Sequence, residues 1–344
     1  MRFALRYIPV LFLLVAGISA CCLVDEDMRD CETDYRLEYQ LRLVTNMTTE
    51  LQTQLSMASE VSVSNAMRTY LGAVFTDHAY DVDLAFYDVD QDSTILHHEA
   101  HIMDASQSSY TLYIPVRRYM HLASANLSSN PLLSIENGEY CHKARVVQEV
   151  RDTVPSHKSG FYTARLPMDI KEGEDQQFDV HLYMANCATA IMVDTLGSGI
   201  RDIKVYLSGF ATGFDMCDSL YQFNYTPIVR ADRIQIDEPG YIAYTAVHFP
   251  SRPATDSKVV INTDDPSVSE MADHPLWHFR VYTTLADGTT TETLLGVSRP
   301  IKPGQFKLLK AHAYTNGTVA PGDPSVSMLV TPDWSPGLDI PVNL

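Results

Sequence analysis

The sequence predicts an all-β protein with two tandem β-sandwich domains, and three features of the chain support this prediction. Residues 35–43 alternate apolar and polar side chains without interruption, which is the pattern of a strand with one buried face. Short apolar segments follow at regular spacing, separated by Gly, Pro and Asp, as is typical of β-sandwiches. The length of 344 residues is that of about two domains.

The first predicted strand has an apolar face made of alternate residues, namely Tyr35, Leu37, Tyr39, Leu41 and Leu43. Residues 48–73 have apolar side chains at three- and four-residue spacings, which indicates a short helix or a long loop. The remaining strands are expected at 81–90, 110–120, 178–194, 200–214, 241–249, 257–262, 277–297 and 307–315. The pair Asp287-Gly288 is the expected turn of a hairpin within 277–297.

A charged loop at residues 171–176 divides these strands into an N-terminal sandwich, 35–173, and a C-terminal sandwich, 174–344. The last eight residues again alternate, with apolar side chains at Leu338, Ile340, Val342 and Leu344. Since Pro341 cannot donate a ladder hydrogen bond, this strand must lie at an edge or pair on one side only. Its apolar face requires burial against its own domain or against a neighbouring molecule.

The N-terminus is typical of an export signal, residues 1–20. Arg2 and Arg6 flank the start of an apolar run of about 14 residues, which ends in small residues and is too short to span a bilayer. Ile18-Ser19-Ala20-Cys21 resembles the bacterial lipobox, in which the cysteine is acylated, so Cys21 is the predicted lipidation site. Residues 21–34 would then be a lipidated acidic tether. A plain signal peptide is the alternative.

Composition excludes some function classes. The formal net charge of −18 becomes −20 once the two arginines of the export signal are removed, so we expect no binding to nucleic acid through a basic patch. Carboxylates and histidines are scattered without a legible catalytic set, so we expect neither enzymatic activity nor a cofactor. His97, Glu99 and His101 would share one face of a strand and are weak candidates for a zinc or copper site. A solvated edge strand is the alternative.

The cysteines left after lipidation of Cys21 are odd in number: Cys22, Cys31, Cys141, Cys187 and Cys217. At least one thiol is therefore unpaired, unless Cys21 is not lipidated. Cys22–Cys31 is one possible disulfide in an oxidising envelope, and Cys187–Cys217 is another if their strands are neighbours.

Several segments together resemble the fimbrillin-like proteins of Bacteroidales, and most closely the FimB and minor-fimbrium anchor-subunit group. They are the lipobox cysteine, "CETDYRLEYQLRL", "VDLAFYDVDQDS" and "HLYMANCATAIMVD". The resemblance implies two transthyretin-like β-sandwich domains in a lipoprotein exposed on the outer membrane. It also implies a structural role, in which the protein builds or anchors a fimbrium with other fimbrial subunits as partners.

In stalk subunits of this family, a trypsin-like protease removes the first strand and the C-terminal strand of a neighbour enters the vacated groove, which is β-augmentation. Here Tyr35–Leu43 would fill the groove and Gly337–Leu344 would be the donor. An anchor that keeps its first strand can only donate, so we expect it to tether the fimbrium and limit its length. A stalk or tip subunit activated by proteolysis, or a surface lipoprotein that binds glycan or host protein, is the alternative.

Overall fold

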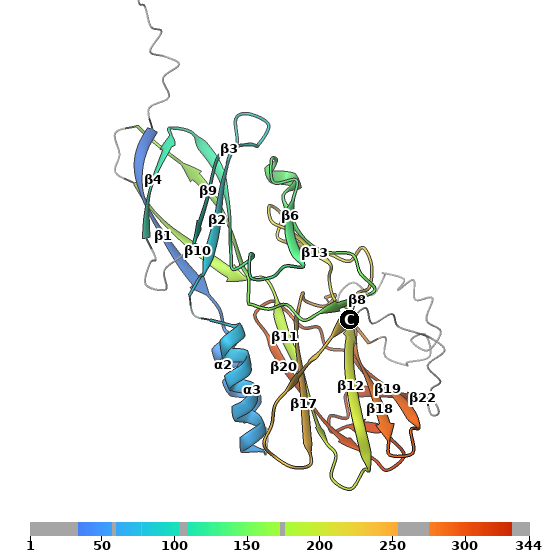
Figure 1. Ribbon diagram of the computed structural model, residues 1–344. Helices are drawn as coiled ribbons and strands as arrows, with labels where there is room; N and C mark the ends of the chain where they lie inside the picture. Colours follow the sequence, from blue (N-terminus) through green and yellow to red (C-terminus); the bar gives the residue numbers. More distant parts are fainter. Residues whose placement is uncertain are drawn as a thin grey trace, which may run out of the picture.

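The structure is a computed structural model that describes residues 34–56, 60–76, 78–102, 109–172, 176–253 and 275–331 (Figure 1). The export signal, Cys21, the acidic tether up to residue 33, the strand expected at 257–262 and the predicted C-terminal strand therefore lie outside the described residues. The described part is mostly strand, and the predicted all-β class with two β-sandwiches is confirmed. Among the described residues there is no helix with the length and apolar character that crossing a bilayer requires.

The N-terminal sandwich is built from one seven-stranded sheet with the order β3-β2-β5-β9-β10-β1-β4. Its strands are β1 (Asp34–Val44), β2 (Asp81–Asp88), β3 (Thr94–Ile102), β4 (Ser109–Pro115), β5 (Arg118–Ala125), β9 (Tyr162–Asp169) and β10 (Gln176–Met184). Strands β9 and β10 pair at only two positions, Tyr183–Thr163 and Met184–Tyr162. The sheet folds over at this narrow junction, so that β10, β1 and β4 face β2 and β5 across a shared apolar core.

A second layer of core lies on the other face of β2 and β5. There a four-stranded sheet, β14-β13-β7-β6, packs against the N-terminal sandwich (Figure 1). Its strands are β6 (Leu133–Glu136), β7 (Arg145–Gln148), β13 (Gly213–Asp215) and β14 (Leu220–Gln222). Leu84 and Phe86 of β2 point into the first core, whereas Ala85 and Tyr87 point into this second one. Both faces of β2 are therefore buried.

The C-terminal sandwich packs a five-stranded sheet, β16-β17-β11-β20-β21, on a six-stranded sheet, β22-β19-β18-β12-β15-β8. Trp277, Phe279, Ile191, Val205 and Leu309 fill the space between them. The strands are β8 (Thr153–Pro155), β11 (Cys187–Asp194), β12 (Ile200–Ser208), β15 (Ile228–Arg230), β16 (Asp232–Ile234), β17 (Tyr241–His248), β18 (Trp277–Leu285), β19 (Thr290–Val297), β20 (Phe306–Ala313), β21 (Val319–Pro321) and β22 (Val326–Thr331). The expected hairpin is present, because β18 and β19 pair antiparallel around Gly288.

Two helices, α2 (Met47–Ser56) and α3 (Val61–Val74), occupy the segment in which the sequence left a helix or a loop open. Both lie against the outer face of the five-stranded sheet (Figure 1). Leu51 and Met67 pack in one continuous cluster with Met192 and Leu308 of that sheet and with the core of the N-terminal sandwich. The N-terminal half of the chain thus covers part of the C-terminal sandwich.

Two segments that the sequence predicts as single strands are each divided between two sheets. Residues 178–194 split at Asn186, so that β10 belongs to the first sheet and β11 to the five-stranded sheet. Asn186 is fully buried, and its side-chain amide accepts from the Phe161 N–H and donates to the Ser159 carbonyl at 2.9 Å. The expected division after residue 173 stays a prediction, and the pairing of β10 favours a division near Asn186.

The second divided segment, 200–214, bends at Gly209 between β12 and β13. Gly209 has a φ of +99°, and a Cβ atom there would lie 2.5 Å from the Leu276 carbonyl oxygen and 2.7 Å from the Trp277 Cα. Glycine supplies both the backbone conformation and the space that the bend requires.

Gly209→Ala is expected to destabilise the protein more than Gly288→Ala. Gly288 also has a positive φ, of +89°, but a Cβ there meets nothing within 4 Å, so this variant isolates backbone strain at about 1–2 kcal/mol. Gly209→Ala adds a steric clash with backbone atoms, for a total loss of roughly 3 kcal/mol or more. Chemical denaturation of the two variants measures the difference, and equal losses would contradict the close approach at Gly209.

Candidate functional site

The candidate site is β1, which is paired along both of its edges. Residues Leu37–Val44 run parallel to Gln176–Tyr183 of β10, and Asp34–Gln40 run antiparallel to Ser109–Pro115 of β4. Parallel neighbours require a long connection, and β10 follows β1 only after most of the N-terminal sandwich has intervened. Strand β1 therefore fills a slot between two strands that lie far from it in the chain.

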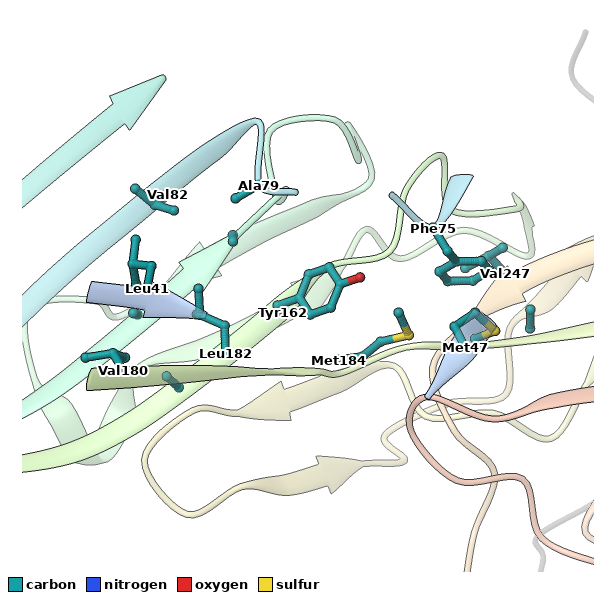
Figure 2. Close-up of a cluster of buried hydrophobic side chains, with 14 of the residues drawn as sticks. Leu41, Met47, Phe75, Ala79, Val82, Tyr162, Val180, Leu182, Met184 and Val247 are labelled. Carbon is teal, nitrogen blue, oxygen red and sulfur yellow. The ribbon is translucent and has the colours of Figure 1, made fainter. Parts of the chain in front are cut away.

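The buried face of β1 follows the predicted alternation. Leu37 and Tyr39 are 1% and 0% exposed, Leu41 is buried, and Leu43 packs at the margin of the same core. Leu41 lies among Val82, Val180 and Leu182 (Figure 2). The side chain of Tyr35 lies outside the described residues, although its backbone pairs with Ile114. Burial of three large side chains stabilises this strand by several kcal/mol in total, at roughly 1.5–3 kcal/mol each.

Tyr39 also makes a buried polar contact that the sequence did not indicate. Its hydroxyl donates to Nε2 of His121 on β5, while His121 Nδ1 donates to the Ala85 carbonyl at 2.9 Å. The imidazole stacks on Phe86 with ring centroids 4.2 Å apart and is fully buried. Burial lowers the pKa of His121 from 6.5 to about 4, against the smaller raising effect of the Ala85 hydrogen bond. His121 is therefore neutral near pH 7, which suits a ring that accepts from Tyr39.

At its end, β1 runs directly into α2. The Thr45 hydroxyl oxygen accepts from the Met47 N–H at 3.0 Å and so caps the first turn of the helix. Met47, Met184, Phe75 and Val247 meet where the strand, the helix and β17 come together (Figure 2). The end of β1 is thereby fixed to the C-terminal sandwich.

The predicted strand donor and the predicted lipidation site cannot be placed. Leu338, Ile340, Val342, Leu344 and Cys21 all lie outside the described residues. The last described strand, β22, ends at Thr331 and forms one edge of the six-stranded sheet.

His97, Glu99 and His101 do share one face of β3, which is an edge strand of the first sheet. Nε2 of His97 lies 2.6 Å from one oxygen of Glu99, and Nε2 of His101 lies 2.7 Å from the other. Partial burial raises the pKa of Glu99, but the two histidine hydrogen bonds outweigh it and the net shift is downward. Across the described residues, no group of three or more His, Cys, Asp or Glu side chains is arranged to hold a metal ion. The three side chains form a hydrogen-bonded row on a half-exposed edge strand.

The suggested Cys187–Cys217 disulfide is wrong. Cys187 is buried beside His248, with its Sγ 3.5 Å from the His248 Nδ1. Cys217 instead has its Sγ 3.2 Å from that of Cys141. Cys187 opens β11 of the five-stranded sheet, whereas Cys217 lies in the turn between β13 and β14 of the four-stranded sheet, so the two cysteines are not on neighbouring strands as the suggestion required. Cys22 and Cys31 lie outside the described residues.

The fold and the slot around β1 define the chain as a two-sandwich protein whose first strand is enclosed by sequence-distant neighbours. The sequence matches no protein-family model. It also matches no curated protein. Among solved structures, it resembles a candidate adhesin from Bacteroides ovatus at 8% identity and a TM-score of 0.51, over 86% of this chain and 95% of that one. This likeness establishes the shared fold.

Two further structures are fimbrial proteins of Porphyromonas gingivalis. The fimbrial anchor protein Mfa2 aligns at 10% identity and a TM-score of 0.47, over 88% of this chain and all (100%) of that one. The tip fimbrial protein Mfa3, truncated at its C-terminus, aligns at 7% identity and a TM-score of 0.44, over 87% and 100% of the respective chains.

Acid is expected to destabilise the protein through its buried histidines. Burial lowers the pKa of His121 to about 4 and the pKa of His157 and of His248 to about 3. In the unfolded chain these histidines bind a proton near pH 6.5, whereas in the folded chain they do so only at a lower pH. Their contribution to the free energy of unfolding is therefore complete above about pH 6.5 and is lost progressively as the pH falls towards 3–4. Each of these histidines is expected to lower the free energy of unfolding by about 2 kcal/mol between pH 7 and pH 5.

Urea unfolding at a series of pH values measures this loss. In His121→Gln, the free energy of unfolding is expected to fall less steeply with pH, because the contribution of one buried histidine is removed. His181→Gln, on the exposed face of β10, is expected to leave the pH dependence unchanged. An unaltered slope in His121→Gln would show that the imidazole beside Tyr39 is not held neutral.

Proposed function

We propose that this protein is a fimbrial subunit held on the outer membrane by lipid at Cys21, and that it is the anchor of the fimbrium. The observation that carries the proposal is the enclosure of β1, which is paired on both edges and has its apolar face buried. A subunit whose slot is already full offers no place for the strand of a neighbour. It joins a fibre only by donating a strand of its own.

The positions of the basic residues support retention of β1. Arg36 and Arg42 have exposed side chains, but their backbones are paired within the sheet. Arg68 lies inside α3, whose other face is buried through Val63, Met67 and Leu71. Proteases cut exposed loop segments most readily, so cleavage at these arginines requires a strand or a helix to open first.

The donor in this proposal is Gly337–Leu344. Its apolar side chains at alternate positions would occupy successive pockets of a neighbour's slot, and its backbone would supply the ladder hydrogen bonds. Pro341 leaves one ladder position without a donor and fits pairing on one side. With a lipid at one end and a donor strand at the other, each molecule makes a single joint, which tethers the fibre and ends its growth.

The first test is the intact mass of the protein extracted from membranes of its native host. The expected mature chain begins at an acylated Cys21 and continues unbroken through β1, because the lipid must stay attached to the folded domain. Cys21→Ala is expected to lack the acyl mass and to leave the membrane fraction. A fimbria-associated chain that starts after Val44 would instead identify a cleaved stalk or tip subunit, and an unmodified chain would refute lipidation.

The second test removes residues 337–344 and leaves the lipidation signal intact. The truncated protein is expected to stay in the outer membrane while fimbriae are shed into the medium, because the tether remains but the joint is lost. Fractionation and electron microscopy measure both outcomes. Asp339→Asn, on the polar side of the alternation, serves as the matched control and is expected to retain fimbriae. Retention of fimbriae by the truncated protein would contradict donation by this segment, and a ligand-binding role would then be favoured.

A further inference from the structure

Cys141 and Cys217 bring two thiols together from opposite halves of the chain. Cys141 opens a short 3-10 turn, η3 (Cys141–Lys143), between β6 and β7, and Cys217 follows β13. Their Sγ atoms lie 3.2 Å apart although the residues are 76 positions apart in sequence. A disulfide bond is about 2.05 Å long, so a movement of little more than 1 Å by the sulfur atoms would close it.

The backbone holds the two thiols in this position. Strand β13 pairs with β7 from Gly213–Val147 to Asp215–Arg145, and the Met216 N–H then donates to the Ala144 carbonyl at 3.0 Å. The Cys141 N–H donates to the Ser93 carbonyl at 3.0 Å, which fixes the other side. The surroundings are the apolar cluster between β2, β5 and the four-stranded sheet. The juxtaposition is therefore built into the sheet and does not depend on a free loop.

We propose that Cys141 and Cys217 form a disulfide in the exported protein, by exchange with an oxidised dithiol of the disulfide-oxidoreductase class. Cys217 is only partly buried, so its thiolate attacks the external disulfide, forms a mixed disulfide and expels one thiolate of the donor. Cys141 then loses its proton to that thiolate and attacks the Cys217 sulfur, which releases the second donor thiolate. Two electrons and two protons pass to the donor, which becomes a dithiol.

The order of these steps follows from burial. Cys141 is 2% exposed, and burial, followed by its contact with Cys217, raises its pKa to about 12. Direct attack by Cys141 on an external disulfide is therefore blocked sterically. Attack on the adjacent Cys217 sulfur is intramolecular and needs no access from solvent.

The pairing also accounts for the odd cysteine, given the lipidation proposed at Cys21. Cys187 is fully buried against His248 and the carbonyls of His248 and Phe249, and burial raises its pKa well above the usual value. It is the thiol that stays reduced. Cys22 and Cys31 are then the two cysteines that remain for a second disulfide.

The bond would close a loop that contains β7 to β13, and β10, the parallel neighbour of β1, lies within it. Tension between the two ends of the chain would then bypass residues 142–216, so it could not pull β10 out of the sheet along the chain. Closing so long a loop also reduces the conformational entropy of the unfolded chain.

The test is a peptide map of the protein extracted from its native host without reductant, with free thiols alkylated under denaturing conditions. The expected result is a peptide that joins Cys141 to Cys217, with Cys187 alkylated before reduction. Alkylation of both Cys141 and Cys217 before reduction, or linkage of either one to Cys22, Cys31 or Cys187, would overturn the proposal. Because the bond needs only an oxidising compartment, it is expected in Cys21→Ala as well, so its fate is independent of the anchor role.

Thermal unfolding gives a second readout. Reductant is expected to lower the Tm of the oxidised protein by about 5–15 °C, given the length of the loop. Cys217→Ala should abolish this response, and Cys187→Ala should retain it. If the wild-type protein does not respond, or if Cys217→Ala still responds fully, the stabilising bond is not the one proposed.

Discussion

The slot between β10 and β4 is the constraint on which the N-terminal sandwich depends. The backbone groups along both strands face β1, and Leu37 and Tyr39 fill the space beneath them. Without a strand there, two rows of backbone donors and acceptors would lose their partners and the core would open to solvent. The fold therefore requires a strand at this position, with apolar side chains at alternate residues.

In this chain the occupant is also part of the connection between the sandwiches. Strand β1 passes through Thr45 into α2, and the two helices cover the outer face of the five-stranded sheet. The chain crosses between the sandwiches again at Asn186, and at Gly209 it passes from the six-stranded sheet to the four-stranded sheet. Asn186 is embedded with Asn130 and Ser159 in a buried network of hydrogen bonds, in which the Asn130 side chain donates to the Ser159 hydroxyl at 2.8 Å. Since these polar groups are paired with each other and with backbone, they fix the crossing without the cost of burying unpaired groups. Removal of β1 would thus disturb contacts in both domains.

Sequence patterns predicted the parts of the fold that depend on local periodicity. The alternation in 35–43 and the Asp287-Gly288 turn both correspond to observed elements. Burial of one strand face requires alternating side chains, and a positive φ favours glycine, so both features can be recognised in the sequence. The sequence predicts a single strand in each of the segments 178–194 and 200–214, because the apolar residues continue without interruption. In the structure, the two halves of each segment belong to different sheets. Nothing in the pattern marks Asn186 as a buried junction. Likewise, the contacts of Tyr39 with His121 and of Cys141 with Cys217 join positions 82 and 76 residues apart, which only strand pairing brings together. At His97, Glu99 and His101 the shared face followed from the period of two, but spacing alone does not separate a metal site from a hydrogen-bonded row.

The proposed anchor role places a particular mechanical demand on β1, and the geometry suits it. In the proposed role the lipid would be attached on the N-terminal side of β1, so that tension would reach the folded protein through this strand. Ladder hydrogen bonds run roughly across the strand direction, and a force along β1 therefore shears all of the bonds to β10 and β4 together. Sheared bonds resist as a group, whereas bonds at a peeled edge break one at a time. A strand enclosed on both sides cannot be peeled from an edge, and one that continues into a packed helix cannot slide through the slot. The enclosure that excludes a neighbour's strand is thus also the one that would let the subunit carry the fibre.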